Sequence, residues 1–341
     1  MIAGLASRDS TLRGLRPFNP LVDLRPTTEL IELAFGEALD PVSREMLREM
    51  RALAWLYGPL FWLLNATRSP LADSYGGYVW MEHGSIVGNI TVHRRHGEKK
   101  GWFISNLAVH PDYRTKGIAR DLMTAGLDMV KQKRAQRVSL EVRADNVAAR
   151  RLYDSLGFTQ VDSVTRMRMD HLRPSRPVLV EDYGIELIKR PHATKLLLLA
   201  ETTLSPEARE IMPLKEDQYR PSLLRRLVSC VGDLLNGRTT YRLAAVSGEA
   251  LAGIVTLRTG GLLRPHSLTL MTHPAHRHRV EEMLLTSALS ALESYRYRAV
   301  VAKIQPSYDF ARDTLLRYGF VEEHTLDLLT LSLEDGQEEH E

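Results

Sequence analysis

The sequence predicts a mixed α/β (α+β) protein made of two copies of one fold, each copy a mixed, mostly antiparallel sheet flanked by helices. Two observations lead to this prediction. Between Ile104 and Phe158, apolar strand patterns alternate with amphipathic helix patterns. The order of signals in that segment then returns in the second half of the chain, and recurrence at a fixed spacing is typical of a repeated fold.

The segment from Ile104 to Phe158 contains five consecutive elements. We predict a strand at Ile104–Val109, a turn at Asp112–Gly117 and a helix that begins at Ile118. A second strand at Val138–Val142 and a second helix at Val147–Leu156 follow. Pro111 ends the first strand because proline cannot donate a ladder hydrogen bond. Gly157 suits the left-handed position that follows a helix end.

The turn before Ile118 has the features of an anion site. The first N–H groups of a helix have no partner inside it, and the helix dipole adds partial positive charge there. Gly117 allows a ligand to approach the backbone closely, and Ala119 is also small. The turn is therefore a candidate phosphate site, although glycine in a strand-to-helix loop is also ordinary turn chemistry. The sequence contains neither a Walker loop nor a G-x-G-x-x-G turn.

The same stretch resembles the core of the GNAT superfamily, the acetyl-CoA-dependent N-acetyltransferases. The turn pattern of that family, [QR]-x-x-G-x-[GA], is matched by Arg114, Gly117 and Ala119. A second pattern, L-E-V-R-x-x-N-x-x-A-x-x-L-Y-x-x-x-G-F, belongs to the branch that acetylates protein N-termini, such as the ribosomal-protein alanine N-acetyltransferases. Leu140–Phe158 matches every specified position of it. With its flanking strands the resemblance extends over Leu12–Asp170.

The resemblance implies an acetyl transfer with two proton events. The acceptor amine arrives as ammonium, with a pKa near ~8 for an α-amine or ~10.4 for a lysine, and must lose a proton before it attacks the thioester. The leaving thiolate benefits from a proton donor. In the resembled branch these roles fall on the Glu of L-E-V-R and the Tyr of L-Y, which are Glu141 and Tyr153 here. From the residues alone, Glu141 also fits a solvated strand face or an ion pair with Arg143, and Tyr153 also fits core packing.

The resemblance further implies how acetyl-CoA is bound. The backbone at the end of the first strand would hold the pantetheine arm and polarise the acetyl carbonyl, and the turn would hold the phosphates. Asn146 would contact CoA and cap the helix that follows it. Lys116 and Arg120 either reach the phosphates or are simply exposed. The expected cofactor-binding residues are Leu107, Ala108, Val109, Arg114, Thr115, Lys116, Gly117, Ile118, Ala119, Arg120, Asn146 and Tyr153.

In front of this core, the sequence predicts a first strand, two helices and a β-hairpin that turns at His83-Gly84. Their expected ranges are Leu12–Phe18, Thr27–Ala38, Pro41–Leu56, Tyr78–Glu82 and Ser85–His93. The aromatic segment Trp55–Trp62 is either a wall of the acceptor site, as the resemblance implies, or a plug of the core.

The second half repeats these fold signals but not the site signals. THPAHRHRV from Thr272 parallels VHPDYRTKG from Val109, and Gly319-Phe320 parallels Gly157-Phe158. Val280 replaces the turn glycine, and the carboxylates of Glu281-Glu282 would repel a pyrophosphate. Lys303, Tyr308 and Leu315 stand in place of Glu141, Asn146 and Tyr153. We expect a degenerate, structural copy, the alternative being a copy that binds another ligand.

These patterns divide the chain into four expected segments. They are a catalytic GNAT-like domain at 1–172, a linker at 173–182, a degenerate GNAT-like domain at 183–333 and an acidic, disordered tail at 334–341.

Composition narrows the class of protein. The net charge of +3 is small for 341 residues and gives no reason to expect nucleic acid. Cys230 is the single cysteine, which excludes an intramolecular disulfide and a Cys-based zinc site. The longest apolar run, Ala52–Ala66, is shorter than the ~20 residues that span a bilayer, and the N-terminus lacks the apolar core of a secretory signal. We expect a cytoplasmic monomer or homodimer, without metal, nucleic-acid or membrane partners.

The expected function is an N-acetyltransferase. It would move an acetyl group from acetyl-CoA, its acyl-donor substrate, to a primary amine of a protein (N-terminus or lysine) or of a small molecule, by direct attack in a ternary complex. The alternative is a non-catalytic acyl-CoA-binding sensor or scaffold. A sensor has no need of Glu141 and Tyr153, so their presence favours the enzyme.

Overall fold

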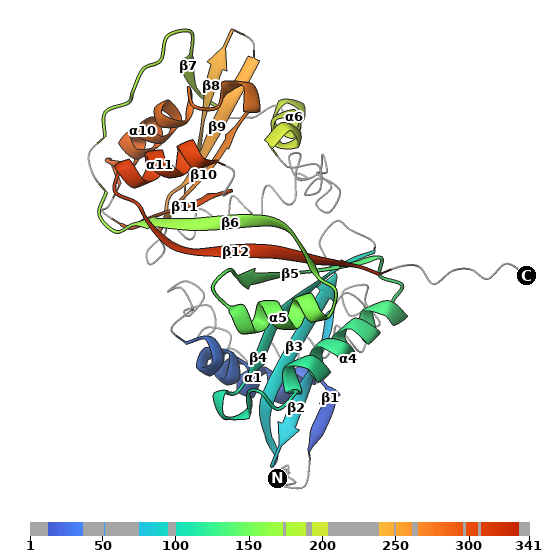
Figure 1. Cartoon of the computed structure of the whole chain (residues 1–341). Coiled ribbons are helices and arrows are strands. Elements are labelled where there is room, and N and C mark those ends of the chain that lie inside the picture. Colours follow the sequence, from blue (N-terminus) through green and yellow to red (C-terminus); the bar gives the residue numbers. More distant parts are fainter. Residues whose placement is uncertain are drawn as a thin grey trace, which may run out of the picture. The chain divides into compact units, whose positions relative to one another are not determined.

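The computed structural model describes residues 13–36, 51, 75–94, 100–172, 175–188, 193–203, 239–248, 250–260, 265–295, 298–305 and 308–333. The helix expected at Pro41–Leu56, apart from Arg51, the aromatic segment Trp55–Trp62 and the tail 334–341 lie outside these residues. Strands and helices form a mixed, mostly antiparallel sheet structure, which confirms the predicted fold class (Figure 1).

The chain forms two compact units, and neither is a single stretch of sequence. Unit 1 comprises Met1–Glu141, Ala148–Thr159 and Leu329–Glu341, and unit 2 comprises Val142–Val147 and Gln160–Leu328. The division into a catalytic domain, a linker, a degenerate domain and a tail, which we expected from the sequence, stays a prediction.

The sheet of unit 1 has the strand order β1-β2-β3-β4-β5. Its pairs are antiparallel except for β4 and β5, which are parallel. The hairpin between β2 and β3 turns at His83-Gly84, as the sequence predicted. Both residues of the turn have positive φ. The five strands span Gly14–Pro17, Tyr75–Glu82, Ser85–Arg94, Gly101–Val109 and Arg137–Arg143.

Helix α1 (Pro20–Phe35) begins earlier than the predicted Thr27. The side chain of Asn19 accepts a hydrogen bond from the backbone N–H of Leu21 (3.1 Å), and Pro20 occupies the first helical position. A cap followed by proline is a strong start signal, and the prediction overlooked it. Asp23 in the first turn is 1% exposed, and Arg16 on β1 donates to both of its oxygens at 2.6 Å. This partly buried ion pair joins β1 to α1.

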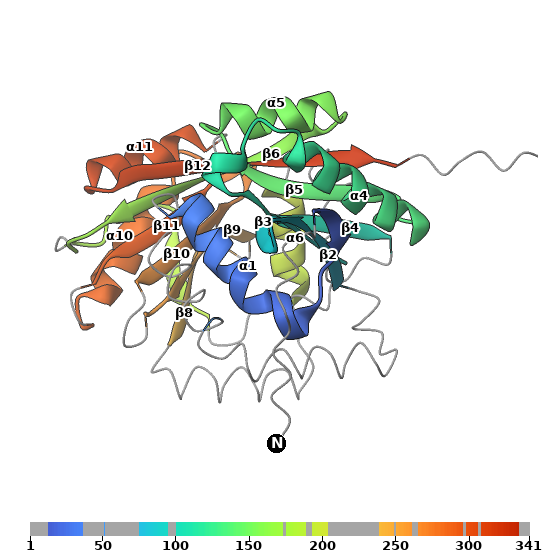
Figure 2. The ribbon, with the colours of Figure 1, turned by 90° about the horizontal axis from the view of Figure 1, so that it is seen from below.

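Helices cover both faces of this sheet. Figure 2 shows α1 on one face and α4 (Ile118–Gln132) on the other, and Leu30 and Ile31 of α1 pack against Ala108 of β4. Helix α4 lies directly on β3, because a Cβ added at Gly88 would lie 2.9 Å from side-chain atoms of Ile118 and Leu122. Helix α5 (Val147–Ser155) follows β5.

Each unit is completed by a strand from the other half of the sequence. After α5, strand β6 (Thr159–Met169) enters unit 2 and pairs antiparallel with β11. The end of β12 (Val321–Ser332) lies in unit 1, where the hydroxyls of Ser139 and Thr330 are 3.0 Å apart in a buried hydrogen bond. The N–H of Leu333 also donates to the carbonyl of Gln136 at 2.8 Å. The two halves of the sequence therefore exchange their final strands.

The sheet of unit 2 has the order β12-β6-β11-β10-β9-β8-β7. Strands β10 and β11 are its parallel pair, in the place that β4 and β5 have in unit 1. Strands β7 to β11 span Gly184–Leu187, Thr240–Ser247, Ala250–Arg258, His266–Thr272 and Val300–Ile304, and helices α6, α10 and α11 span Ala193–Thr203, Glu281–Leu292 and Asp309–Arg317.

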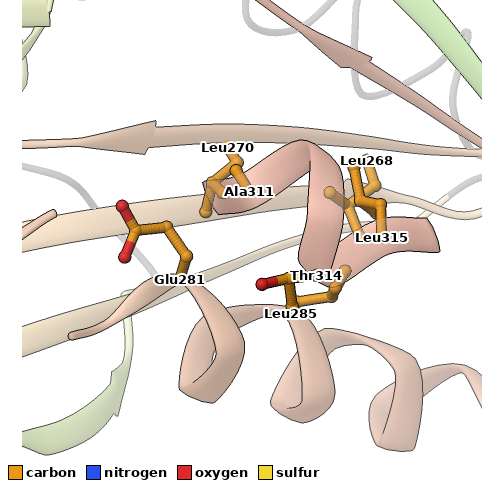
Figure 3. Close-up of a pocket in the computed structure, with 7 residues that line it drawn as sticks. All are labelled: Leu268, Leu270, Glu281, Leu285, Ala311, Thr314 and Leu315. Carbon is orange, nitrogen blue, oxygen red and sulfur yellow. The ribbon is translucent and has the colours of Figure 1, made fainter. Parts of the chain in front are cut away.

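Glu281, the first residue of α10, is turned into the core of unit 2. It is 1% exposed and lies at one end of a pocket lined otherwise by Leu268, Leu270, Leu285, Ala311, Thr314 and Leu315 (Figure 3). Its Oε2 atom has no hydrogen-bond partner within the described part of the chain. Burial raises the pKa of this carboxyl, opposed by backbone N–H groups at the helix start. Glu282 is more exposed and accepts a hydrogen bond from the Tyr318 hydroxyl at 3.0 Å.

Replacing Glu281 should make unit 2 less sensitive to pH. Because the folded pKa is raised, the folded chain keeps a proton that the unfolded chain has lost at pH values between the unfolded and the folded pKa. Stability from this group is therefore full below the unfolded pKa of about 4.3 and falls as pH rises above it. We expect Glu281→Gln to raise Tm at neutral pH and to flatten its decline from acid to neutral pH in circular dichroism melts. Glu282→Gln, on the same turn, is the control; an unchanged slope in Glu281→Gln would contradict the burial argument.

The Ser139–Thr330 pair offers a test of strand exchange. Thr330→Val preserves the shape but leaves the buried Ser139 hydroxyl without this partner, so we expect a loss of about 1–3 kcal/mol in the free energy of unfolding. The double variant with Ser139→Ala should lose less than the sum of the two single variants, measured by urea denaturation. Ser332→Ala, at an exposed position of β12, is the control. Strictly additive losses would argue against this contact.

Candidate functional site

The candidate site lies in unit 1 where β4 and β5 separate. In their parallel pairing, Gly101 lies opposite Arg137 and Ile104 lies opposite Leu140. The pairing stops there, although both strands continue. The expected pantetheine-binding residues Leu107, Ala108 and Val109 all follow this point. Ala108 is buried against α1, whereas Leu107 and Val109 are half-buried.

A β-bulge that was not predicted from the sequence includes the first of these residues, Leu107. Asn89 is opposite Ala108 and Thr91 is opposite Ser105, so Asn106 and Leu107 together face the single residue Ile90. Asn106 has a left-handed φ of 54°, which asparagine tolerates better than most residues. The side-chain amide of Asn89 donates to the carbonyl of Asn106 at 3.0 Å. The available sequence signal was the polar pair Ser105-Asn106 inside a mainly apolar strand.

The turn after β4 has the backbone geometry of the predicted anion site. A short 3₁₀ helix, η2 (Pro111–Tyr113), is capped by the His110 ring, which accepts from the N–H of Asp112 at 3.3 Å. Thr115 (φ 62°) and Gly117 (φ 83°) are both left-handed. Gly117 is the N-cap of α4 and forms no side-chain cap, and a Cβ built on it would meet nothing within 4 Å. The first N–H groups of α4 therefore start beside open space.

The remaining turn residues differ in what they contact. Ile118 is 4% exposed and anchors the helix in the core, and Ala119 is half-buried. Arg114 donates to the carbonyl of Ala34 on α1 at 3.2 Å. Arg120 donates to the hydroxyl of Ser155 on α5 at 2.7 Å, and the exposed Lys116 ammonium lies 4.5 Å from the centre of the Tyr113 ring. The structure thus brings the positive charges of this turn to its exposed side.

The two expected catalytic residues differ sharply in burial. Glu141 is exposed on β5 between the buried residues Leu140 and Val142. Arg143 forms two hydrogen bonds with Asp145, at 2.9 and 2.7 Å, which accounts for its charge without Glu141. Tyr153 is 6% exposed, and burial raises the pKa of its hydroxyl to about 12. Asn146 lies exposed just before α5.

The corresponding turn in unit 2 has the same outline with a different backbone at its end. The 3₁₀ helix η3 (Pro274–His276) is capped by His273, and His278 has a φ of 66°. Val280 is fully buried with a φ of −106°, where Gly117 is left-handed and open. Leu315, in place of Tyr153, is 1% exposed in the core.

Within the described residues, no group of three or more His, Cys, Asp or Glu side chains could hold a metal ion. In the same part of the chain, no helix is both long and apolar enough to cross a membrane.

Comparison with known proteins gives relatives for the first half. Residues 31–158 match the model of the acetyltransferase (GNAT) family. N-alpha-acetyltransferase 30 of Schizosaccharomyces pombe is 34% identical over 96 residues, 28% of this chain and 63% of that protein. The [ribosomal protein bS18]-alanine N-acetyltransferase of Escherichia coli (strain K12) is 44% identical over 55 residues, 16% of this chain and 37% of that protein. The chain spans less than two thirds of the length of either relative.

Solved structures resemble the whole chain in fold. A GCN5-related N-acetyltransferase from Sphaerobacter thermophilus superposes with a TM-score of 0.62 at 16% identity, covering 95% of this chain and 97% of that one. A tandem GNAT protein from the clavulanic acid biosynthesis pathway gives 0.59 at 16% identity, covering 95% and 99%. Residues 31–158 therefore resemble the acetyltransferase (GNAT) family, and the chain is similar in fold to a tandem GNAT protein.

Proposed function

We propose that this protein is an N-acetyltransferase that moves an acetyl group from acetyl-CoA to a primary amine. The observation that supports this most is the open, left-handed Gly117 turn at the start of α4, which follows the part of β4 that no longer pairs with β5. The names of both relatives specify an acetyltransferase, and both favour the terminal amine of a protein as acceptor. Small-molecule amines belong in the same test panel.

The donor would lie along β4 and end at α4. The backbone from Leu107 to Val109 would hold the pantetheine arm, since β5 no longer pairs with β4 there. The N–H groups that begin α4 would bind the pyrophosphate, with Lys116 and Arg120 close enough in sequence to add positive charge. Asn146 would add a polar contact to the same donor.

The chemistry would be a direct attack in a ternary complex. The amine nitrogen bonds to the acetyl carbon, the C–S bond breaks, and the electron pair leaves on sulfur. The nitrogen then loses its second proton, which replaces the proton that Tyr153 gives to sulfur. Glu141, exposed to solvent, would take the ammonium proton directly or through water and return it to solvent. Tyr153 has a pKa of about 12, so its hydroxyl is protonated at neutral pH and available as a donor to the developing thiolate.

The second copy would bind no acetyl-CoA. A left-handed backbone is costly for a β-branched residue, so Val280 adopts a right-handed conformation and fills core space instead. Unit 2 would then support unit 1, and titration of the whole chain should give one acetyl-CoA per chain.

Tyr153→Phe should lower kcat by about 10²-fold and leave acetyl-CoA affinity near its wild-type value, because the lost hydroxyl acts mainly on the developing thiolate. The measurement is release of CoA thiol from acetyl-CoA across a panel of peptide and small amines. Tyr78→Phe on β2 is the matched control. An unchanged kcat would remove Tyr153 from the mechanism, and a wild-type protein that binds acetyl-CoA but releases no CoA with any amine would support the sensor instead.

Gly117→Asp should weaken acetyl-CoA binding far more than Gly117→Asn. The two side chains have similar shape, and asparagine tolerates the left-handed φ, so the comparison isolates the negative charge beside the pyrophosphate. We expect a ratio of at least about tenfold in Kd by calorimetry, which is about 1.4 kcal/mol. Equal affinities in two folded variants would contradict the anion site.

A further inference from the structure

The bulge in β4 releases one peptide unit from the sheet. Among the described residues, Asn106 and Leu107 are paired with neither β3 nor β5. The pairing of β4 with β3 omits these two residues, and its pairing with β5 ends at Ile104. Bulges re-aim the backbone, and they are common beside active sites. The left-handed φ of Asn106 is strained for a residue with a side chain, so surrounding contacts must hold it.

Asn89 is the contact that holds it. Its side-chain amide donates to the carbonyl of Asn106 at 3.0 Å. The peptide bond between Asn106 and Leu107 is planar and trans, so its C=O and N–H point in opposite directions. Fixing the Asn106 carbonyl toward Asn89 therefore fixes the Leu107 N–H away from Asn89 and away from β3.

Asn89 is a poor choice for stability alone. It is 1% exposed, and its Oδ1 atom has no partner among the described residues. An unsatisfied buried acceptor destabilises the fold, and the neighbouring positions Val87, Ile90 and Val92 are buried and apolar. An apolar residue would fit this strand better, which indicates a role other than core packing.

The second copy is an internal comparison. Gly253 pairs with Thr272 there, as Gly88 pairs with Val109 in the first copy. The next residue after Gly253 is Ile254, buried and apolar, in the position of Asn89. From this point the β9–β10 register runs without a break, and no residue of β10 has a positive φ. The buried amide and the bulge are therefore present together in one copy and absent together in the other.

We propose that Asn89 is a positioning residue for acetyl transfer, which holds the Asn106–Leu107 peptide so that the Leu107 N–H faces the acetyl carbonyl of the donor. This inference rests on the proposed function. A fixed N–H aimed at the carbonyl oxygen stabilises the negative charge that develops there during attack, and loss of one such donor typically lowers kcat by about 10²–10³-fold.

The test replaces Asn89 with the residue of the second copy. Asn89→Ile should keep or raise Tm, lower kcat by at least about tenfold and change the Kd of acetyl-CoA little. Asn89→Leu, which is close to asparagine in shape, is the second variant if isoleucine prevents folding. Thr91→Val removes another buried polar group from β3 beyond the bulge and should keep wild-type kcat.

A rescue experiment separates positioning from general damage. Glycine adopts a left-handed φ without strain, so Asn106→Gly added to Asn89→Ile should restore part of kcat. The ¹⁵N–¹H resonance of Leu107 in the ligand-free protein should shift in Asn89→Ile and move back in the double variant. Wild-type kcat in Asn89→Ile, or a loss that glycine restores in neither readout, would overturn the inference. A wild-type chain without transferase activity would instead refute the proposed function, while the Leu107 resonance would still report on the bulge.

Discussion

The exchange of β6 and β12 is the constraint on which both units depend. Each of these strands begins beside one half of the sequence and is paired in the other, so their register has to be fixed without help from a short turn. Polar pairs fix it. In unit 1 Ser139 meets Thr330, and in unit 2 the Ser163 hydroxyl donates to Asp327 at 2.7 Å. Thr165 meets Thr325 at 3.0 Å. A slip by one residue would turn all of these groups to the wrong face and leave them unpaired.

Local signals predicted the local parts of this structure well. The hairpin at His83-Gly84, the strand ending before Pro111 and the helix from Ile118 each depend on neighbouring residues, and the structure has all three. The start of α1 was missed although its signal, Asn19-Pro20, is equally local. The partners of β6 and β12 were not predictable in this way, since strand pairing over such separations leaves no mark in the sequence pattern.

The sequence predicted which residue types form the candidate site, but it did not predict the backbone conformation of β4 there. Gly117 pointed to a left-handed turn because glycine is suited to it. The β4 bulge had no comparable signal. Ser105 and Asn106 are only a short polar interruption, and the extra residue becomes evident only from the pairing of β4 with β3. The two copies differ at both places. Val280 and Ile254 place buried apolar side chains in unit 2 at the positions where unit 1 has the open Gly117 and the half-satisfied side-chain amide of Asn89.

Strand exchange also sets the order in which the molecule can be completed during synthesis. Ser139 and its partner Thr330 are 191 residues apart. At a translation rate of about 5–20 residues per second, unit 1 would wait about 10–40 s with its β5 edge uncovered before β12 is made. An exposed strand edge readily pairs with the wrong chain. The nascent chain therefore passes through an interval in which this edge is open to pairing with other chains. A ribosome that stalls within unit 2 would leave the first half without its last strand.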